Sequence, residues 1–397
     1  MTAEVMTPTS PPETEQFQAG RVLTLTVGHA IHDTYAAFLS PLLPVFIEAL
    51  DLSRTAAGLL SVFYQGPSLL QPLIGHFSDQ VPAHRVRYWV ILAPTVAGVA
   101  MSLLGIMPAY SLLVLSLTVA GLNSAFLHSI GPVMAGRLSG KSLGQGMGLW
   151  MVGGELGRTL GPVVIAATIQ WLTLKGTPWL VVGGFLTSIL LYVRLRDVPG
   201  RPFSREDRPA WHQALRVMRP LLAPLLGIII VRAFMLAALT TYLPVFLTEE
   251  GAALWFAGIS LSVLEAAGVV GALLGGSLSD RLGRRTVLLA SLILTPALML
   301  AFLAVDGWGR FPLLLLLGFT ALSLTPVIMA LVQESFPENR ALANGAYMAL
   351  SFGLRSGAVV VLGAIGDFWG MRTAFTVSAM IPVIGLPFLF LLPRSQR

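Results

Sequence analysis

The sequence predicts an all-α integral membrane protein with twelve transmembrane helices, arranged as two parallel six-helix repeats around a central cavity. Three observations predict this fold. Of the 397 residues, 55% are hydrophobic and 11% are charged, with a mean hydropathy of +0.78, which leaves too little polar surface for a soluble globule. The apolar runs have the length of spanning helices and lack the alternation of a β-barrel. The two halves also share short motifs at an offset of about 200 residues.

Gly, Pro and charged residues separate the apolar segments. Twelve segments are expected, at about residues 21–48, 54–78, 86–107, 110–136, 144–170, 176–194, 221–248, 253–279, 286–305, 311–333, 341–366 and 371–392. An even number of crossings places both termini on the same side of the membrane.

The segments fall into two groups of six. Residues 1–20 are polar and lack the order of a signal peptide, so we expect a disordered cytosolic tail there. Six-helix bundles are expected at 21–194 and 221–393. Between them, 195–220 is interrupted by proline and rich in arginine, which predicts a cytosolic linker.

The basic residues indicate the orientation. With both termini inside, eighteen of the 25 Lys and Arg residues fall on the cytoplasmic side and four outside. This bias predicts a multi-pass protein of the inner (plasma) membrane with cytoplasmic termini. Because these residues are scattered among short loops and form no basic face, the net charge of +6 does not indicate nucleic-acid binding.

The halves repeat each other in register. The motif LPVF occurs at 43–46 and again at 243–246, and GHFSD at 75–79 is matched by GGSLSD at 275–280. Parallel repeats of this kind predict a substrate site near the membrane midplane between the halves. They also predict alternating access, in which one half rocks against the other.

The two repeated loops resemble the loop between the second and third helices of the major facilitator superfamily. Glycine in such a loop allows close helix packing, and an Asp among arginines can latch the cytoplasmic side in one state. The alternative is a basic turn that only sets orientation. The candidate gate residues are Gly75, Asp79, Arg85, Gly276, Asp280, Arg281 and Arg284.

Within that superfamily the chain resembles the fosmidomycin-resistance-like efflux proteins over nearly its whole length. The matching stretches include GHAIHD at 28–33, SLLQPLIGHFSD at 68–79 and ALVQESFPENRALANGAYMALSFG at 330–353. The chain departs from the family in having His-Ser-Ile at 128–130, where the family often has His-Pro-Glu. An Arg at 355 is also not part of the family pattern.

The first apolar segment carries His29, His32 and Asp33 at positions i, i+3 and i+4. This spacing puts all three on one face of a helix, which must point into the bundle. A carboxylate beside imidazoles inside a membrane is typical of a proton-coupling or substrate site. A static His–Asp hydrogen bond that packs the helix is the structural alternative.

The fifth segment carries Glu155 and Arg158, whose spacing lets them form a structural ion pair or take a functional role. Gly153, Gly157 and Gly161 lie at every fourth position, which predicts close packing against another helix.

Other buried polar residues are expected at His128, Arg232, Glu265 and Arg355. Three arginines and three carboxylates balance within the cavity, and protonation of a carboxylate would leave it positive. This favours an anionic or zwitterionic substrate at Arg158 or Arg355. Alternatively, Arg232 reaches the interface and pairs with Glu265, and His128 bridges helices by a hydrogen bond.

The leading functional prediction is a secondary active transporter that exports a small amphiphilic or anionic compound or drug in exchange for protons. Uptake symport of an organic anion with protons or sodium is the alternative, and a membrane sensor without transport is a weaker one. No phosphate-binding loop, metal-ligand spacing or activated nucleophile is evident in the sequence, so we expect neither an enzyme nor a cofactor or metal. A monomer in the lipid bilayer is expected, with a small-molecule substrate as its partner.

Overall fold

A computed structural model describes residues 16–71, 73–74, 83–140, 142–198, 211–335 and 340–391. All regular structure in these ranges is helical, and no strand occurs in them, which confirms the all-α prediction. Ten helices within the described ranges are long and apolar enough to cross a membrane. Helix α7 (Leu143–Leu172) is not among them, and its glycines and the charged Glu155 and Arg158 lower its hydropathy.

The N-terminal half consists of six rods, several of which are built from consecutive helices. They are α1 (Ala19–Ala36) with α2 (Leu39–Ala49), α3 (Arg54–Gln65) with η1 (Gly66–Leu70), α5 (Ala83–Ser102) with η2 (Leu103–Ile106), α6 (Tyr110–Leu138), α7 and η3 (Leu174–Leu180) with α8 (Val181–Leu195). Each rod agrees with one predicted apolar segment.

The C-terminal half has the same succession of rods. They are α9 (Trp211–Leu236) with the π-helical η4 (Ala237–Tyr242) and α10 (Leu243–Glu249), α11 (Leu254–Leu282), α12 (Arg284–Leu303), η5 (Gly307–Gly309) with α13 (Arg310–Leu322) and α14 (Leu324–Ser335), α15 (Arg340–Trp369), and α16 (Met371–Met380) with α17 (Pro382–Leu391). Helix α9 begins at Trp211, so its first ten residues lie within the segment expected as a linker. Residues 199–210 of that segment lie outside the described ranges.

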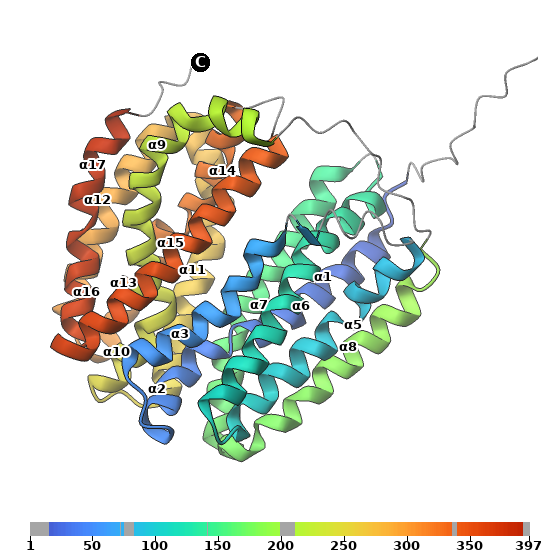
Figure 1. Ribbon diagram of the computed structural model, residues 1–397, viewed down its shortest axis with the longest axis horizontal. Helices are drawn as coiled ribbons and strands as arrows, with labels where there is room; N and C mark the ends of the chain where they lie inside the picture. The colour runs from blue at the N-terminus through green and yellow to red at the C-terminus, as the bar shows by residue number, and fades with distance from the viewer. Residues whose placement is uncertain are drawn as a thin grey trace, which may run out of the picture.

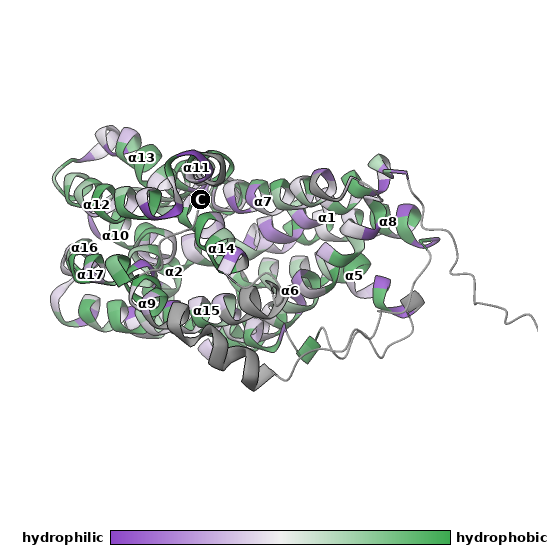
Figure 2. Ribbon diagram, turned by 90° about the horizontal axis from the view of Figure 1, so that it is seen from above, coloured by the Kyte–Doolittle hydropathy of each residue, from purple (hydrophilic) through white to green (hydrophobic). Residues whose placement is uncertain are grey.

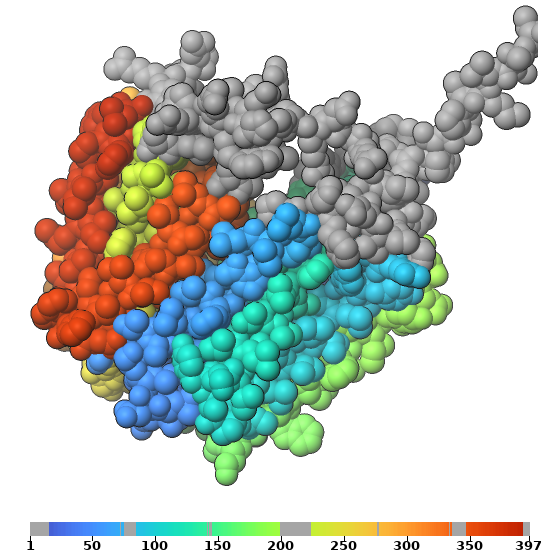
Figure 3. All heavy atoms as spheres, in the orientation of Figure 1, coloured from blue at the N-terminus to red at the C-terminus, as the bar shows by residue number. Residues whose placement is uncertain are grey.

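The twelve rods of the described ranges form two bundles side by side (Figure 1). Helix α1 starts and α17 ends on the same side of the molecule, which we call the termini side; the other is the opposite side. The bundles meet on the opposite side, where α3 packs on α15, α7 on α11 and α2 on α10. In the space-filling view a gap opens between them toward the termini side (Figure 3).

The apolar core supports this arrangement. A large cluster of buried side chains, including Phe38, Phe246 and Leu362, extends through both halves, and a second cluster around Trp150 fills the termini side of the N-terminal half. Seen from the termini side, the outer helices are mostly hydrophobic, whereas hydrophilic residues of α1 lie in the interior beside α7 and α6 (Figure 2). The polar residues of α1 are therefore held away from lipid by the surrounding helices.

Candidate functional site

Helix α1 presents His29, His32 and Asp33 on one face, and all three side chains are buried, with 4%, 1% and 3% of each residue exposed. Neighbouring helices α5, α6, α7 and α8 pack around α1. The prediction that this face points into the bundle is confirmed.

His128 on α6 completes a cluster of proton acceptors. Its Nε2 lies 3.3 Å from Nε2 of His29 and 3.7 Å from Oδ1 of Asp33, and Nε2 of His29 lies 3.4 Å from Oδ2 of Asp33. The ligand atoms of all three residues lie within 4.8 Å of one another, close enough to hold one small cation. The sequence singled out His128 but did not place it here, because 99 residues separate it from His29.

Backbone carbonyls determine which ring nitrogens carry hydrogen. Nδ1 of His29 lies 2.8 Å from the carbonyl oxygen of Trp150, and Nδ1 of His128 lies 2.9 Å from that of Ser124. A carbonyl oxygen only accepts, so each Nδ1 is the donor. In the neutral rings both Nε2 atoms are then acceptors, and they face each other and the Asp33 carboxylate. A proton or another cation shared among the three groups would stabilise such an arrangement.

Arg158 connects three carboxylates from three helices. It forms an ion pair with Glu155 one turn before it on α7, and lies 3.7 Å from Oδ2 of Asp33 and 3.9 Å from Oε2 of Glu265 on α11. Although Arg158 lies near the middle of α7, 42% of its side chain is exposed, because the space between the halves is open. The charged group therefore lines a cavity and bridges the two halves.

Asp33 has a denser set of partners than the other two carboxylates. Besides Arg158, His29 and His128, it lies 2.9 Å from Nδ1 of His32. Nε2 of His32 is buried without a hydrogen-bond partner. Any change in the charge of Asp33 therefore acts on several side chains at once.

Glycines of α7 allow the close approach of α1. A Cβ added at Gly153, Gly157 or Gly161 would come within 2.4–2.5 Å of a backbone carbonyl oxygen of α1. The predicted small-residue seam is thus confirmed as the contact between these helices. It brings Arg158 beside Asp33, because both residues lie along this interface.

Two arginines inside the C-terminal half, Arg232 and Arg355, form no ion pair with a carboxylate among the described residues. Arg232 is 5% exposed and donates to Oη of Tyr347 at 3.3 Å and to the hydroxyl of Thr325, while Arg355 donates to Oγ1 of Thr240 at 2.6 Å. The alternative that Arg232 reaches the interface and pairs with Glu265 is wrong, since Glu265 lies beside Arg158 instead. The three carboxylates and three arginines balance in number, but all three carboxylates lie beside Arg158 and none lies within 4 Å of Arg232 or Arg355.

Polar contacts that the sequence analysis missed close the opposite side. Asp367, near the end of α15, accepts hydrogen bonds from the backbone of Arg54 at 2.6 Å and of Thr55 at 3.0 Å, at the start of α3. Arg54 also pairs with Glu249 at 2.6 Å, and Tyr242 donates to the carbonyl oxygens of Val359 and Arg54. We call this group, Arg54, Thr55, Tyr242, Glu249 and Asp367, the opposite-side seal. The only feature of the sequence that pointed to this group was the position of its charged residues, Arg54, Glu249 and Asp367, at the ends of apolar segments.

The candidate gate residues on the termini side are only partly described. Gly75 and Asp79, and the surroundings of Gly276, lie outside the described residues, and Arg85 and Arg281 are exposed. Arg284 pairs with Asp280 at 2.6 Å and with Glu334 at 2.7 Å. These contacts join α11, α12 and α14 within the C-terminal half.

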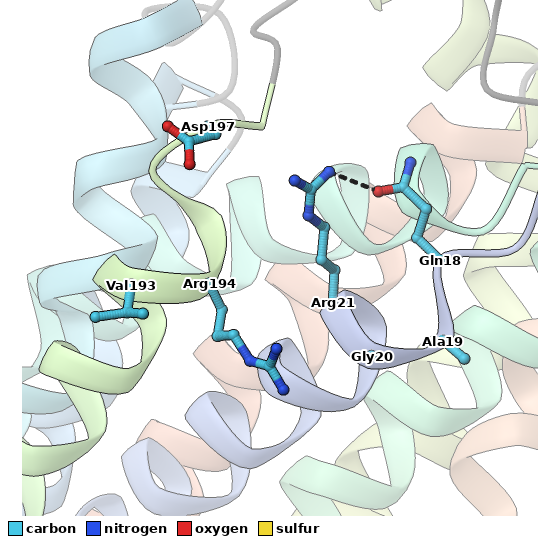
Figure 4. Close-up of a pocket in the computed structure, with 7 residues that line it drawn as sticks. All are labelled: Gln18, Ala19, Gly20, Arg21, Val193, Arg194 and Asp197. Atoms are coloured by element: carbon cyan, nitrogen blue, oxygen red, sulfur yellow. Dashed lines mark hydrogen bonds between the residues drawn. The ribbon is translucent and has the colours of Figure 1, made fainter.

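A separate pocket of about 430 Å³ lies at the termini side, between the start of α1 and the end of α8 (Figure 4). Arg21 donates to Gln18 at its rim, and Arg194 also lines it. None of the buried charged residues between the two halves lines this pocket.

Comparison with known proteins supports the same architecture. The chain is 23% identical over 381 residues to the fosmidomycin resistance protein of Escherichia coli (strain K12). The aligned region covers 92% of this chain and 91% of the relative. It is 24% identical over 391 residues to an uncharacterized MFS-type transporter, YfnC, of Bacillus subtilis (strain 168), covering 95% and 93%.

Solved structures share the fold at lower sequence identity. An inward-facing, occupied bacterial homolog of the human lysosomal transporter Spinster matches with a TM-score of 0.78 and 15% identity, over 94% of this chain and 96% of that chain. A D-xylose-proton symporter matches with a TM-score of 0.73 and 16% identity, over 96% and 99%. The family model of the Major Facilitator Superfamily matches residues 25–356 and 257–397. With two six-helix halves around a charged cavity and this match over most of its length, the chain belongs to the Major Facilitator Superfamily and is a multi-pass transporter of the inner membrane.

Proposed function

We propose that the protein exports a small amphiphilic or anionic compound in exchange for protons, by alternating access, with the termini side in the cytoplasm. The observation that carries the proposal is the convergence of Nε2 of His29, Nε2 of His128 and the carboxylate of Asp33. A shared cation would stabilise three acceptors at these distances, and a proton is the smallest one. This cluster is therefore the binding site for the coupling proton.

Arg158 links this proton site to the opposite half. It lies between Asp33 on α1 and Glu265 on α11, with Glu155 as its strongest partner. A proton added to the cluster weakens the attraction of Asp33 for Arg158, so the guanidinium group moves toward Glu155 and Glu265. The contact between α7 and α11 then differs between the protonated and deprotonated states, as coupling requires.

The orientation and direction of transport follow from different features. The excess of Lys and Arg in the loops of the termini side supports a cytoplasmic position for that side. The gap between the halves then faces the cytoplasm, where an exporter loads its substrate. Similarity to a protein named for fosmidomycin resistance favours export.

Transport in liposomes tests the proposal. Protein is reconstituted with a pH-sensitive dye in the lumen, and fosmidomycin or phenylphosphonate is added outside. Exchange for protons should raise the luminal pH, whereas symport should lower it. Asp33→Asn should abolish the substrate-dependent signal, while Asp51→Asn, which changes an exposed carboxyl of the same type, should leave it intact.

The outcomes separate the alternatives. Substrate-dependent acidification of the lumen would replace export by uptake symport. A signal that Asp33→Asn leaves unchanged would make the helix α1 cluster a structural network and refute its role in coupling.

A further inference from the structure

The two halves of the cavity carry opposite net charge, and Arg232 and Arg355 on the C-terminal side have buried donors without acceptors. We infer that Arg355, flanked by Thr240 and Ser351, binds the anionic group of the transported molecule, a carboxylate or a phosphonate. This inference rests on the proposed transport function and names the substrate class and the residue that recognises it.

The distribution of charge is the first argument. All three cavity carboxylates, Asp33, Glu155 and Glu265, lie within 4 Å of Arg158. No carboxylate among the described residues lies that close to Arg355 or Arg232. Arg158, which the sequence analysis offered as a substrate ligand beside Arg355, is therefore already neutralised, whereas Arg355 has no carboxylate within 4 Å in the described part of the chain.

Unused donors are the second argument. Nε of Arg355, Nε of Arg232 and the hydroxyl of Ser351 are all buried without a hydrogen-bond partner. Tyr347, Ser351 and Arg355 follow each other at every fourth position, so they form one stripe along α15. Arg232 joins the stripe through Tyr347, and Thr240 joins it through Arg355. A buried cation and unpaired donors on one stripe are destabilising unless an acceptor with negative charge is present.

The geometry of α9 and η4 is the third argument. Thr240 lies in the π-helical turn η4, where the wider helical turn changes the direction of the side chains that follow Leu236. Its hydroxyl accepts from Arg355 and donates to the carbonyl oxygen of Leu236. This contact holds the guanidinium group in place and leaves its remaining donors for a ligand.

The position of Arg355 is the fourth argument. Val359, one turn further along α15, accepts the hydrogen bond of Tyr242 in the opposite-side seal. Arg355 therefore lies near the middle of α15, one helical turn on the termini side of the contact between Tyr242 and Val359. An anion that enters between the halves from the termini side therefore reaches Arg355 before it reaches the opposite-side seal.

Direct binding tests this assignment without transport. Isothermal titration calorimetry on the protein in a neutral detergent uses phenylphosphonate, benzoate and inorganic phosphate, with dimethyl phenylphosphonate as the uncharged comparison. Phenylphosphonate should bind and its dimethyl ester should not. Arg355→Gln should weaken phenylphosphonate binding by about tenfold or more, as expected for the loss of a charge-assisted hydrogen bond.

Matched variants control for charge and folding. Lys175→Gln removes an exposed positive charge on the opposite side and should leave binding unchanged. Arg355→Lys keeps the charge but not the fork of donors, so it should bind with intermediate affinity. Size-exclusion chromatography should give the same monodisperse peak for every variant.

Several results would overturn the assignment: equal binding by Arg355→Gln and wild type, no binding of any of the three anions by wild type, or a response to phosphatidylglycerol but not to water-soluble anions. The result is also distinct from that of the transport assay. Asp33→Asn should lose proton exchange yet retain phenylphosphonate binding, so failure of proton coupling and failure of anion recognition are seen separately.

Discussion

The opposite-side seal predicts that Asp367 controls the equilibrium between the two access states. Its carboxylate accepts hydrogen bonds from the backbone N–H groups of Arg54 and Thr55 and from the hydroxyl of Thr55. Ser53 caps the next free N–H group, that of Ala56, from within the same half. The first turn of α3 is thus fully capped only while α15 lies against it, and Asp367→Ala should favour the state open on the opposite side.

The expected magnitude follows from the hydrogen bonds that this substitution removes. Helix N-caps contribute about 0.5–2 kcal/mol, and a negative charge at a helix N-terminus adds roughly 0.3–1 kcal/mol. The ion pair with Arg54 spans 3.8 Å and both side chains are partly exposed, so it adds little. Water replaces some of these bonds when the seal opens. We therefore expect a net change of about 1–2 kcal/mol, which is roughly a 5- to 30-fold change in the ratio of the two states.

Distance measurements between spin labels test this prediction. The chain has no cysteine, so labels can be attached without removing native residues. Cysteines at Ala49→Cys and Ala253→Cys place one label on each half, at positions on the opposite side. Asp367→Ala should raise the ratio of long to short distances by roughly 5- to 30-fold.

A matched control uses an exposed carboxyl on the same side. Glu48→Gln removes a negative charge and should leave the distance distribution unchanged. If Asp367→Ala gives the same distribution as wild type, or if Glu48→Gln has an equal effect, the capping argument is refuted.

Two further predictions concern stability. Gly157→Ala should lower the unfolding free energy by about 1–3 kcal/mol through overpacking, because its Cβ would lie 2.4 Å from the carbonyl oxygen of Ala30. Gly148→Ala changes the same helix at a position where the added Cβ has no atom within 4 Å, so it should leave the unfolding free energy unchanged. Equal thermal unfolding of both variants would contradict this prediction. Hydrogen bonds from Arg372 are the main reason why the pKa of Glu250 is lower than its ordinary value of 4.5. A lowered pKa stabilises the folded state above the unfolded value, and this contribution is lost as the pH falls through the folded value. The difference in melting temperature between wild type and Glu250→Gln should therefore shrink as the pH falls below about 4.5; a difference independent of pH would contradict this.

The sequence determined features that depend on local spacing and composition. Hydropathy and length were sufficient for an all-helical membrane protein, since a spanning segment satisfies its backbone hydrogen bonds internally. The spacing of His29, His32 and Asp33 placed them on one buried face, and the spacing of Gly153, Gly157 and Gly161 predicted a close helix contact. Helical periodicity is a property of neighbouring residues and needs no knowledge of the fold.

Only the tertiary structure decided which charges meet. The acceptor pair of His29 and His128 joins helices separated by 99 residues, and the contact between Arg54 and Asp367 joins positions separated by 313. Counting charges suggested a balanced cavity, but packing places all three carboxylates at Arg158 and leaves Arg355 without a carboxylate within 4 Å among the described residues. Electrostatic interactions depend on distance and burial, and for residues far apart in the chain both are determined by how the helices pack.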